Sequence, residues 1–191
     1  RYRLAADALT ATFDRLVVTG IPVGNFHEGG RLRFGPDGML YIGTGDARDP
    51  RSSQEMTSFS GKILRLRDNG SIPDDNPFHG NAIFVLGLRN MQAFDWIDRS
   101  TMIVADHGPS GELGRTGHDE VSFARAGDNL GWPNQWRCDE AAGRVRPFLV
   151  WKNATPPGGL VHYTGTSIPE WEGSVLIATL KSAHLHRISF T

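Results

Sequence analysis

The chain contains 191 residues, of which 39% are hydrophobic and 21% are charged, and its formal net charge is −1. This composition is typical of a globular domain with one substantial core. Because 20 basic residues nearly balance 21 acidic ones, the chain has no overall field that would attract nucleic acid or an anionic membrane, and we expect no nucleic-acid partner.

Short sequence signals exclude further classes of protein. No apolar run approaches the ~18 residues that indicate a transmembrane helix, so we expect no transmembrane segment. The first residues, Arg1–Leu4, lack the apolar core of a signal peptide. Cys138 is the only cysteine, which excludes a disulfide within the chain and gives no information on the compartment.

Glycine and proline clusters divide the chain into short apolar runs, which is typical of strands and turns. In chain order we expect strands at Thr12–Thr19, Arg31–Phe34, Met39–Gly43, Lys62–Arg67, Ile83–Leu86, Met91–Trp96, Thr101–Ala105, Val121–Ala124, Leu160–Tyr163, Ser174–Thr179 and His184–Phe190. The segment Ala6–Asp14 fits either a short helix or a strand, and no run shows a helical period of 3.6 residues. The sequence therefore predicts an all-β fold, either a sandwich, a barrel or a propeller.

A weak repeat favours the propeller among these three. Phe34–Tyr41, Phe94–Ile103 and Ile168–Ile177 share one plan, in which an apolar or aromatic residue precedes a polar turn and then a strand. Successive propeller blades repeat a strand–turn–strand unit of this kind.

The first of these units is flanked by two candidate catalytic residues, His27 and Asp46. The turn Gly35–Gly38 joins Arg31–Phe34 to Met39–Gly43, because proline presets φ and glycine accepts positive φ. A hairpin brings its two ends together, so we expect His27 and Asp46 to meet at one rim of a sheet. A histidine oriented by a carboxylate is a good general base, although a histidine of this kind can also be an ordinary loop residue.

Nine motifs then occur in the order found in one enzyme family. They are His27–Leu32, Phe34–Gly38, Gly45–Asp46, Gly61–Leu66, Asp75–Phe78, Leu88–Asn90, His107–Pro109, Asp119–Val121 and Gly131–Pro133. In this order they resemble the soluble PQQ-dependent glucose/sorbosone (aldose sugar) dehydrogenases. Any one of them is a weak signal, but nine in register across most of the chain form a specific pattern.

The resemblance implies a six-bladed β-propeller that is longer than this chain. Residues 1–191 would then form a single partial propeller domain of about four blades, truncated at both ends. It also implies PQQ and Ca²⁺ as cofactors, a sugar substrate, an electron acceptor, and a periplasmic or extracellular location. The activity would be oxidation of the anomeric carbon of an aldose to a lactone.

The resemblance also assigns roles to residues. His27 would take the proton of the sugar hydroxyl, with Asp46 as its orienting carboxylate. Arg89 would stabilise negative charge at the reactive carbonyl of PQQ, and Asn90 and His107 would contact the cofactor. Lys181 would pair with a PQQ carboxylate, although it also fits an ordinary solvated charge.

The remaining assignments are less specific. The carbonyl oxygens of Gly108 and Pro109 would bind the Ca²⁺ that also holds PQQ. Trp151 would cover the flat cofactor, and it fits a core tryptophan equally well. Asp119 and Glu120 are adjacent in an expected strand, so they should point to opposite faces and not share one ligand sphere. His184 and His186 alternate like a metal pair but lack an evident third ligand.

Some residues depart from the family pattern. Phe26 stands where glucose dehydrogenases have an acidic sugar contact, and the loop Ser110–His118 is longer than usual. These changes surround the expected sugar-binding rim, so they put the identity of the sugar in question. The alternative function is a non-catalytic extracellular recognition module of the same superfamily, since fold does not fix function. A structural β domain without a site is the third interpretation.

Overall fold

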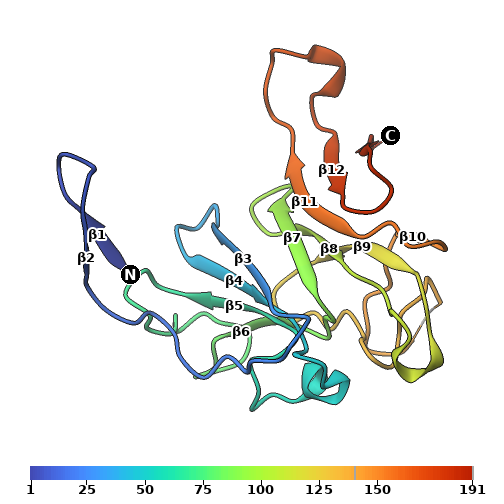
Figure 1. Cartoon of the computed structure of the whole chain (residues 1–191), viewed down its shortest axis with the longest axis horizontal. Helices are drawn as coiled ribbons and strands as arrows, with labels where there is room; N and C mark the ends of the chain where they lie inside the picture. The colour runs from blue at the N-terminus through green and yellow to red at the C-terminus, as the bar shows by residue number, and fades with distance from the viewer. Residues whose placement is uncertain (140, 191) are drawn as a thin grey trace.

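The structure is a computed structural model that describes residues 1–139 and 141–190, and its strands form four antiparallel sheets (Figure 1). The strands are β1 (Tyr2–Leu4), β2 (Ala11–Phe13), β3 (Gly29–Phe34), β4 (Leu40–Thr44), β5 (Lys62–Leu66), β6 (Ile83–Leu86), β7 (Met91–Trp96), β8 (Met102–Asp106), β9 (Asp119–Ala124), β10 (Leu149–Trp151), β11 (Pro157–His162), β12 (Val175–Thr179) and β13 (Leu185–Ile188). The only helices in this part of the chain are the short 3₁₀ helices η1 (Pro50–Gln54), η2 (Glu112–Gly114) and η3 (Pro169–Trp171). None of the described helices has the length and apolarity needed to cross a bilayer.

The sheets are arranged like neighbouring blades. Two have four strands, in the orders β3-β4-β5-β6 and β10-β9-β8-β7, and β11-β12-β13 forms the third. The first strands of these sheets lie together, since β7 contacts both β3 and β11. Asp95 of β7 joins all three, because its carboxylate lies 3.1 Å from Arg33 Nη1 and accepts the His162 N–H at 2.9 Å. The all-β prediction is confirmed, while the number of blades stays a prediction.

The predicted repeat corresponds to the first hairpin of each sheet, namely β3–β4, β7–β8 and β11–β12. In the first hairpin, Gly38 N donates to Gly35 O at 2.9 Å and closes the predicted turn. Arg65 of β5 fixes this turn from the side, because its Nε donates to Asp37 Oδ2 at 2.9 Å and its Nη1 donates to Asp75 Oδ1 at 2.8 Å. Two of the motifs, Phe34–Gly38 and Asp75–Phe78, therefore stabilise the rim opposite His27.

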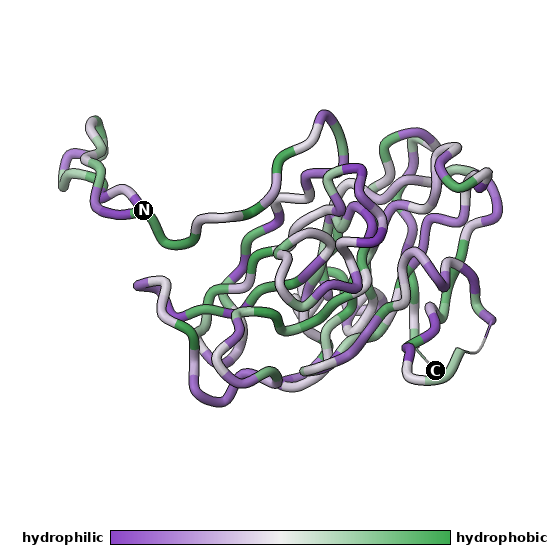
Figure 2. The backbone as a smooth tube through the Cα atoms, turned by 90° about the horizontal axis from the view of Figure 1, so that it is seen from below, coloured by the Kyte–Doolittle hydropathy of each residue, from purple (hydrophilic) through white to green (hydrophobic). Residues whose placement is uncertain are grey.

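The clearest differences from the expected strands lie at the N-terminus, where β1 was not predicted, and at β10. The strand expected over Thr12–Thr19 is only Ala11–Phe13, because its partner β1 is three residues long and the strand pairing ends at Phe13. Strand β10 was not predicted, since it is a three-residue edge strand that follows a long irregular stretch. The hairpin of β1 and β2 projects away from the body in both views (Figures 1 and 2).

The core consists of three apolar clusters. The first lies between the sheet that begins with β3 and the sheet that begins with β7, and includes Met91 and Phe94. The second includes Val121 and Ile177 and joins the β7 sheet to the β11 sheet, and the third lies on the other face of the β3 sheet. Figure 2 shows these hydrophobic stretches within the body of the molecule. Burial of this apolar surface stabilises the fold by about 25 cal/mol per Å². It holds the sheets face to face and keeps their rims in register.

Candidate functional site

The candidate site lies at the rim where β3 begins and β4 ends. Gly29 of β3 pairs with Thr44 of β4, so His27 and Asp46 leave the sheet side by side. A Cβ on Gly45 would lie 1.8 Å from the carbonyl oxygen of His27, so only glycine permits this close approach. The predicted juxtaposition of His27 and Asp46 is therefore produced by the hairpin together with one glycine.

His27 and Asp46 form a hydrogen-bonded pair. His27 Nδ1 lies 2.7 Å from Asp46 Oδ1, and the two side chains are 9% and 0% exposed. The Arg48 N–H donates to the same oxygen at 2.9 Å. A carboxylate only accepts, so His27 Nδ1 bears the proton and Nε2 has its lone pair free. No described group bonds to Nε2. His27 also has a φ of 65°, a backbone strain of the type found at functional sites.

Trp132 completes the environment of the carboxylate. Its Nε1–H donates to Asp46 Oδ2 at 2.9 Å, across 86 residues of sequence. Gln54 Nε2 in turn donates to the Trp132 carbonyl at 2.6 Å. Sequence reasoning noticed Trp132 only as part of the motif Gly131–Pro133 and missed Gln54, because neither contact leaves a signal in local spacing.

Arg89 lies directly beside this cluster. Its side chain is 2% exposed and its guanidinium carbon lies 5.7 Å from the centre of a Trp132 ring. The Nε–H donates to Glu112, and the terminal nitrogens donate to the His107 carbonyl at 3.3 Å and to Ser110 Oγ at 3.2 Å. A buried arginine needs such partners, because an unpaired charge in the interior is strongly destabilising.

Glu112 is the charged partner of Arg89. Partial burial acts to raise the pKa of Glu112, but the hydrogen bond from Arg89 and the N–H of Ser110, at 2.9 Å, outweigh it and lower that pKa. Glu112 belongs to the long loop Ser110–His118. Sequence reasoning noted the length of this loop but not that one of its residues neutralises Arg89.

The backbone of the Arg89–Asn90 turn is held by Asp106 at the end of β8. Asp106 Oδ2 accepts the Arg89 N–H at 2.8 Å and Oδ1 accepts the Asn90 N–H at 2.7 Å. Burial raises the pKa of Asp106 to about 6, although both hydrogen bonds act against the rise. The Asp106 carboxylate therefore fixes the backbone position from which the Arg89 side chain extends.

Asn90 and His107 are joined into one hydrogen-bonded chain. Asn90 Oδ1 accepts the Gly29 N–H at 3.2 Å and a Gln92 N–H at 3.0 Å, and Asn90 Nδ2 lies 3.2 Å from His107 Nδ1. His107 Nε2 lies 2.8 Å from the Pro157 carbonyl, so Nε2 bears the proton and Nδ1 accepts from Asn90. Burial lowers the pKa of His107. Both side chains thus connect the sheets at this rim.

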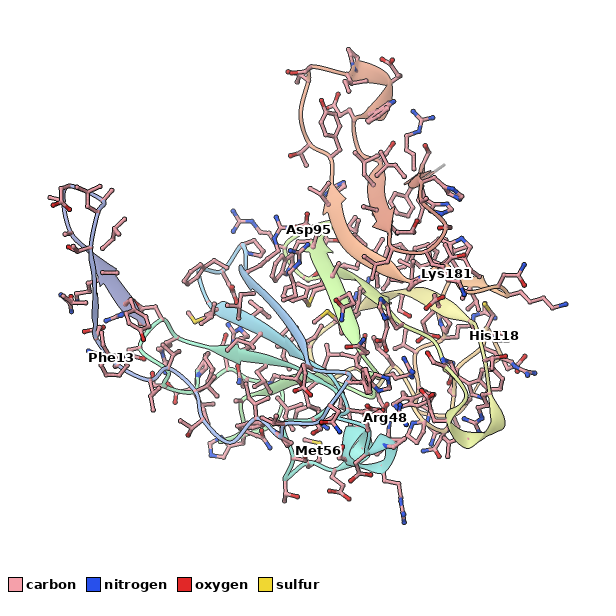
Figure 3. The ribbon with its side chains drawn as sticks, viewed as in Figure 1. Phe13, Arg48, Met56, Asp95, His118 and Lys181 are labelled. Atoms are coloured by element: carbon pink, nitrogen blue, oxygen red, sulfur yellow. The ribbon has the colours of Figure 1, made fainter. Side chains whose placement is uncertain are left out.

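A cavity of about 350 Å³ lies next to this network. It is lined by His107, Gly108, Pro109, Ser110, Thr116, Gly117, Asp119, Ala154, Pro156 and Lys181. The cavity gathers four of the residues predicted to contact a cofactor or metal, although they are separated by up to 74 positions. Figure 3 shows Lys181 and His118 on the same side of the molecule.

The wall of this cavity contains oxygen atoms without donors. Among the described residues, nothing donates a hydrogen bond to the carbonyl oxygens of Gly108 and Pro109. Lys181 is exposed, and no described carboxylate pairs with it. The cavity therefore combines oxygen atoms suited to a hard cation with an ammonium suited to an anion.

Asp119 and Glu120 behave differently from one another. Asp119 lines the cavity, and its carboxylate accepts the Gly108 N–H at 3.0 Å and the Thr155 N–H at 2.6 Å. Glu120 does not line the cavity, and its burial, together with the charges of Asp106 and Asp119, raises its pKa well above the usual range. The two carboxyl groups therefore lie in different surroundings, and their separation in a ligand sphere stays a prediction.

Two predicted features lie outside the cavity. Trp151 packs against the second core cluster, with its ring centre 5.1 Å from that of His186. His184 and His186 lie 4.9 Å apart, and the described residues contain no cluster of three or more metal-ligating side chains. Trp151 is partly buried at the edge of this cluster, and its contact with a cofactor stays a prediction; the histidine pair has no described third ligand.

Comparison with known proteins gives consistent matches. A family model described as glucose/sorbosone dehydrogenase matches residues 1–191. The aldose sugar dehydrogenase YliI of Escherichia coli is 31% identical, over 94% of this chain and 52% of the relative. Quinoprotein glucose dehydrogenase B of Acinetobacter calcoaceticus is 32% identical, over 70% of this chain and 31% of the relative. The chain thus spans about half or less of these relatives.

A solved structure shows the same fold. The PQQ-bound aldose sugar dehydrogenase of Streptomyces coelicolor superposes with a TM-score of 0.87 and 32% identity, over 100% of this chain and 54% of that protein. The arrangement of sheets is therefore shared along the whole length of this chain.

Proposed function

Because the chain belongs to the glucose/sorbosone dehydrogenase family, we propose that it is part of an enzyme that oxidises the anomeric carbon of an aldose to a lactone. The proposed cofactors are PQQ and Ca²⁺. The observation that supports this most directly is the His27–Asp46 pair at 2.7 Å, next to a cavity bounded by Gly108, Pro109 and Lys181. A histidine with a free Nε2, near groups that suit a metal and an anion, supports the proposed reaction.

His27 is the proposed base. Asp46 holds the proton on Nδ1, so Nε2 accepts the proton of the anomeric hydroxyl. Asp46 then stabilises the imidazolium that forms. Removal of this proton makes departure of the C1 hydrogen with its electron pair feasible, and PQQ, when bound, supplies the acceptor for that pair.

Arg89 is the proposed electrostatic group. Of its five N–H donors, three are occupied by Glu112, His107 and Ser110. Two donors remain, one on each terminal nitrogen, and they can stabilise negative charge on a neighbouring oxygen. The other contacts hold the guanidinium in a single orientation.

The residues present fit the proposed cofactors. Ca²⁺ takes oxygen ligands, including backbone carbonyls, and the carbonyls of Gly108 and Pro109 have no described donor. A Cβ on Gly108 would lie 2.1 Å from Gly117 O, so the loop requires glycine here. Lys181 would pair with a carboxylate of PQQ. Asn90 is already bonded to three protein groups, so its proposed contribution is to hold His107.

Reconstitution of the full-length protein tests this function. We expect PQQ with Ca²⁺ to raise the melting temperature and to produce dye reduction with at least one aldose in a panel. The variant His27→Ala should retain the thermal shift and lose turnover by about 100-fold or more. Bound PQQ without turnover on any aldose would overturn the reaction, and the absence of a PQQ-induced shift would favour the recognition module.

A location outside the cytoplasm and a separate electron acceptor form part of the same proposal. Cell fractionation tests the location, because enzyme recovered only in the cytosolic fraction would contradict it. Phe26, which is 64% exposed beside the base, makes the sugar panel necessary, since this position lacks a carboxylate for a sugar hydroxyl.

A further inference from the structure

Trp132 lies between the two groups to which the proposed reaction assigns chemistry. Its indole N–H donates to Asp46 Oδ2 at 2.9 Å, and the Arg89 guanidinium carbon lies 5.7 Å from the ring centre. We propose that Trp132 is a positioning residue that fixes the Asp46 carboxylate and thereby holds His27 in the tautomer needed for a base. The inference rests on the proposed function for its kinetic consequence but not for its structural one.

The carboxylate of Asp46 has three donors. His27 Nδ1 and the Arg48 N–H share Oδ1, at 2.7 Å and 2.9 Å, while Trp132 is the described donor to Oδ2. Asp46 is 0% exposed, so no solvent contact replaces a lost donor. Without the indole N–H, Oδ2 is left as a buried oxygen with no hydrogen-bond donor. Rotation of the carboxylate, so that both oxygens share the donors His27 Nδ1 and Arg48 N–H, then lowers its free energy. That rotation changes the hydrogen bond to His27.

Trp132 is itself rigidly held. It is 3% exposed, its backbone N–H donates to the Gly87 carbonyl at 3.0 Å, and its carbonyl accepts from Gln54 at 2.6 Å. Gln54 is held by two hydrogen bonds with Asn129, at 3.0 Å and 2.8 Å. A side chain anchored in this way can impose an orientation on its partner.

The competing explanation is that Trp132 only fills space in the core. Trp132→Phe separates the two, because it removes the N–H and keeps an aromatic ring. Trp96→Phe is the packing control, since the partly buried Trp96 ring packs at 4.9 Å from Tyr41 and 5.6 Å from Phe94 and its indole N–H donates no hydrogen bond to a described residue. A pure packing role predicts similar behaviour for both variants.

The first readout is the tautomer of His27 in the full-length protein without cofactor, measured from its ¹⁵N ring shifts. We expect wild type and Trp96→Phe to show the Nδ1–H form with only a trace of the Nε2–H form, and Trp132→Phe to raise the population of the Nε2–H form about tenfold. An unchanged tautomer in Trp132→Phe would overturn the inference. This result does not depend on turnover, so it stands or falls separately from the proposed function.

The second readout is kinetic. With PQQ and Ca²⁺ present, Trp132→Phe should lower kcat by about tenfold while KM changes less than twofold, because orientation of the base is lost and substrate binding is not. Equal kcat in Trp132→Phe and Trp96→Phe would contradict the role. If Trp132→Phe does not fold, hydrogen exchange of the wild-type indole N–H decides. Exchange at least 100-fold slower at Trp132 than at Trp96 supports the hydrogen bond, and equal exchange overturns it.

Discussion

The Arg89–Glu112 ion pair makes a sharp prediction about stability. The two side chains are 2% and 13% exposed, so removal of the carboxylate leaves a buried guanidinium with only neutral acceptors. At an effective dielectric constant near 20, two charges about 4 Å apart attract by roughly 4 kcal/mol. Desolvation consumes part of this, and two acceptors remain, so we expect Glu112→Ala to lower the free energy of unfolding by about 2 kcal/mol.

The prediction is best measured as a double-mutant cycle. Glu112→Ala, Arg89→Met and the double variant are unfolded in urea, with the free energy of unfolding obtained from the fluorescence transition. Because an isolated buried charge is worse than an absent pair, the double variant should lose less than the sum of the single losses, with a coupling of about 2 kcal/mol.

An exposed ion pair provides the control. The side chains of Arg67 and Asp74 are 39% and 98% exposed, so Asp74→Ala should change the free energy of unfolding by about 0.5 kcal/mol or less. Additive losses for Arg89 and Glu112, within about 0.5 kcal/mol, would refute the reasoning that these two groups depend on one another.

Three further predictions concern single positions. Gly45→Ala should lower stability and abolish activity, because its Cβ meets the His27 carbonyl at 1.8 Å, whereas Gly159→Ala, which meets only one side-chain atom at 3.8 Å, should be tolerated in a thermal melt. Burial lowers the pKa of Lys62 to about 8, so between about pH 8 and 10.5 the unfolded chain binds one proton more than the folded chain. The free energy of unfolding should therefore rise with pH in this range, by about 3 kcal/mol at most. Lys62→Met should remove this pH dependence when unfolding is measured in urea. Lys181→Ala should weaken PQQ binding about tenfold in a fluorescence titration with kcat nearly unchanged, and equal affinity would contradict its assignment.

Local signals predicted the hairpin of β3 and β4 and the meeting of His27 with Asp46. The turn Gly35–Gly38 determines the register of that hairpin, and register determines which residues leave the rim together. Such contacts are predictable because they depend on a turn type and a short stretch of alternating residues.

Other contacts could not be predicted from local signals. Trp132 reaches Asp46 across 86 residues, so no spacing indicates the bond. Glu112 reaches Arg89 because Gly111 and Leu113 adopt positive φ, of 118° and 54°, which redirects the loop. Leucine rarely adopts such a conformation, so only the surrounding structure reveals it.

The small strands were the other source of difference. Strand β10 pairs with β9 over three residues only, from Leu149 with Val121 to Trp151 with Asp119. Its existence depends on an available edge of β9 and not on its own composition. Tertiary pairing of this kind overrides local propensity.

The most direct test of the central claim is the rate at which an aldose reduces bound PQQ in His27→Gln compared with wild type. Both full-length proteins are loaded with PQQ and Ca²⁺, mixed with substrate in a stopped-flow instrument, and followed by the absorbance of the cofactor. We predict a decrease of about 100-fold or more in the reduction rate, with PQQ affinity within about twofold of wild type. Reduction of PQQ at the wild-type rate in His27→Gln would contradict the assignment of His27 as the base.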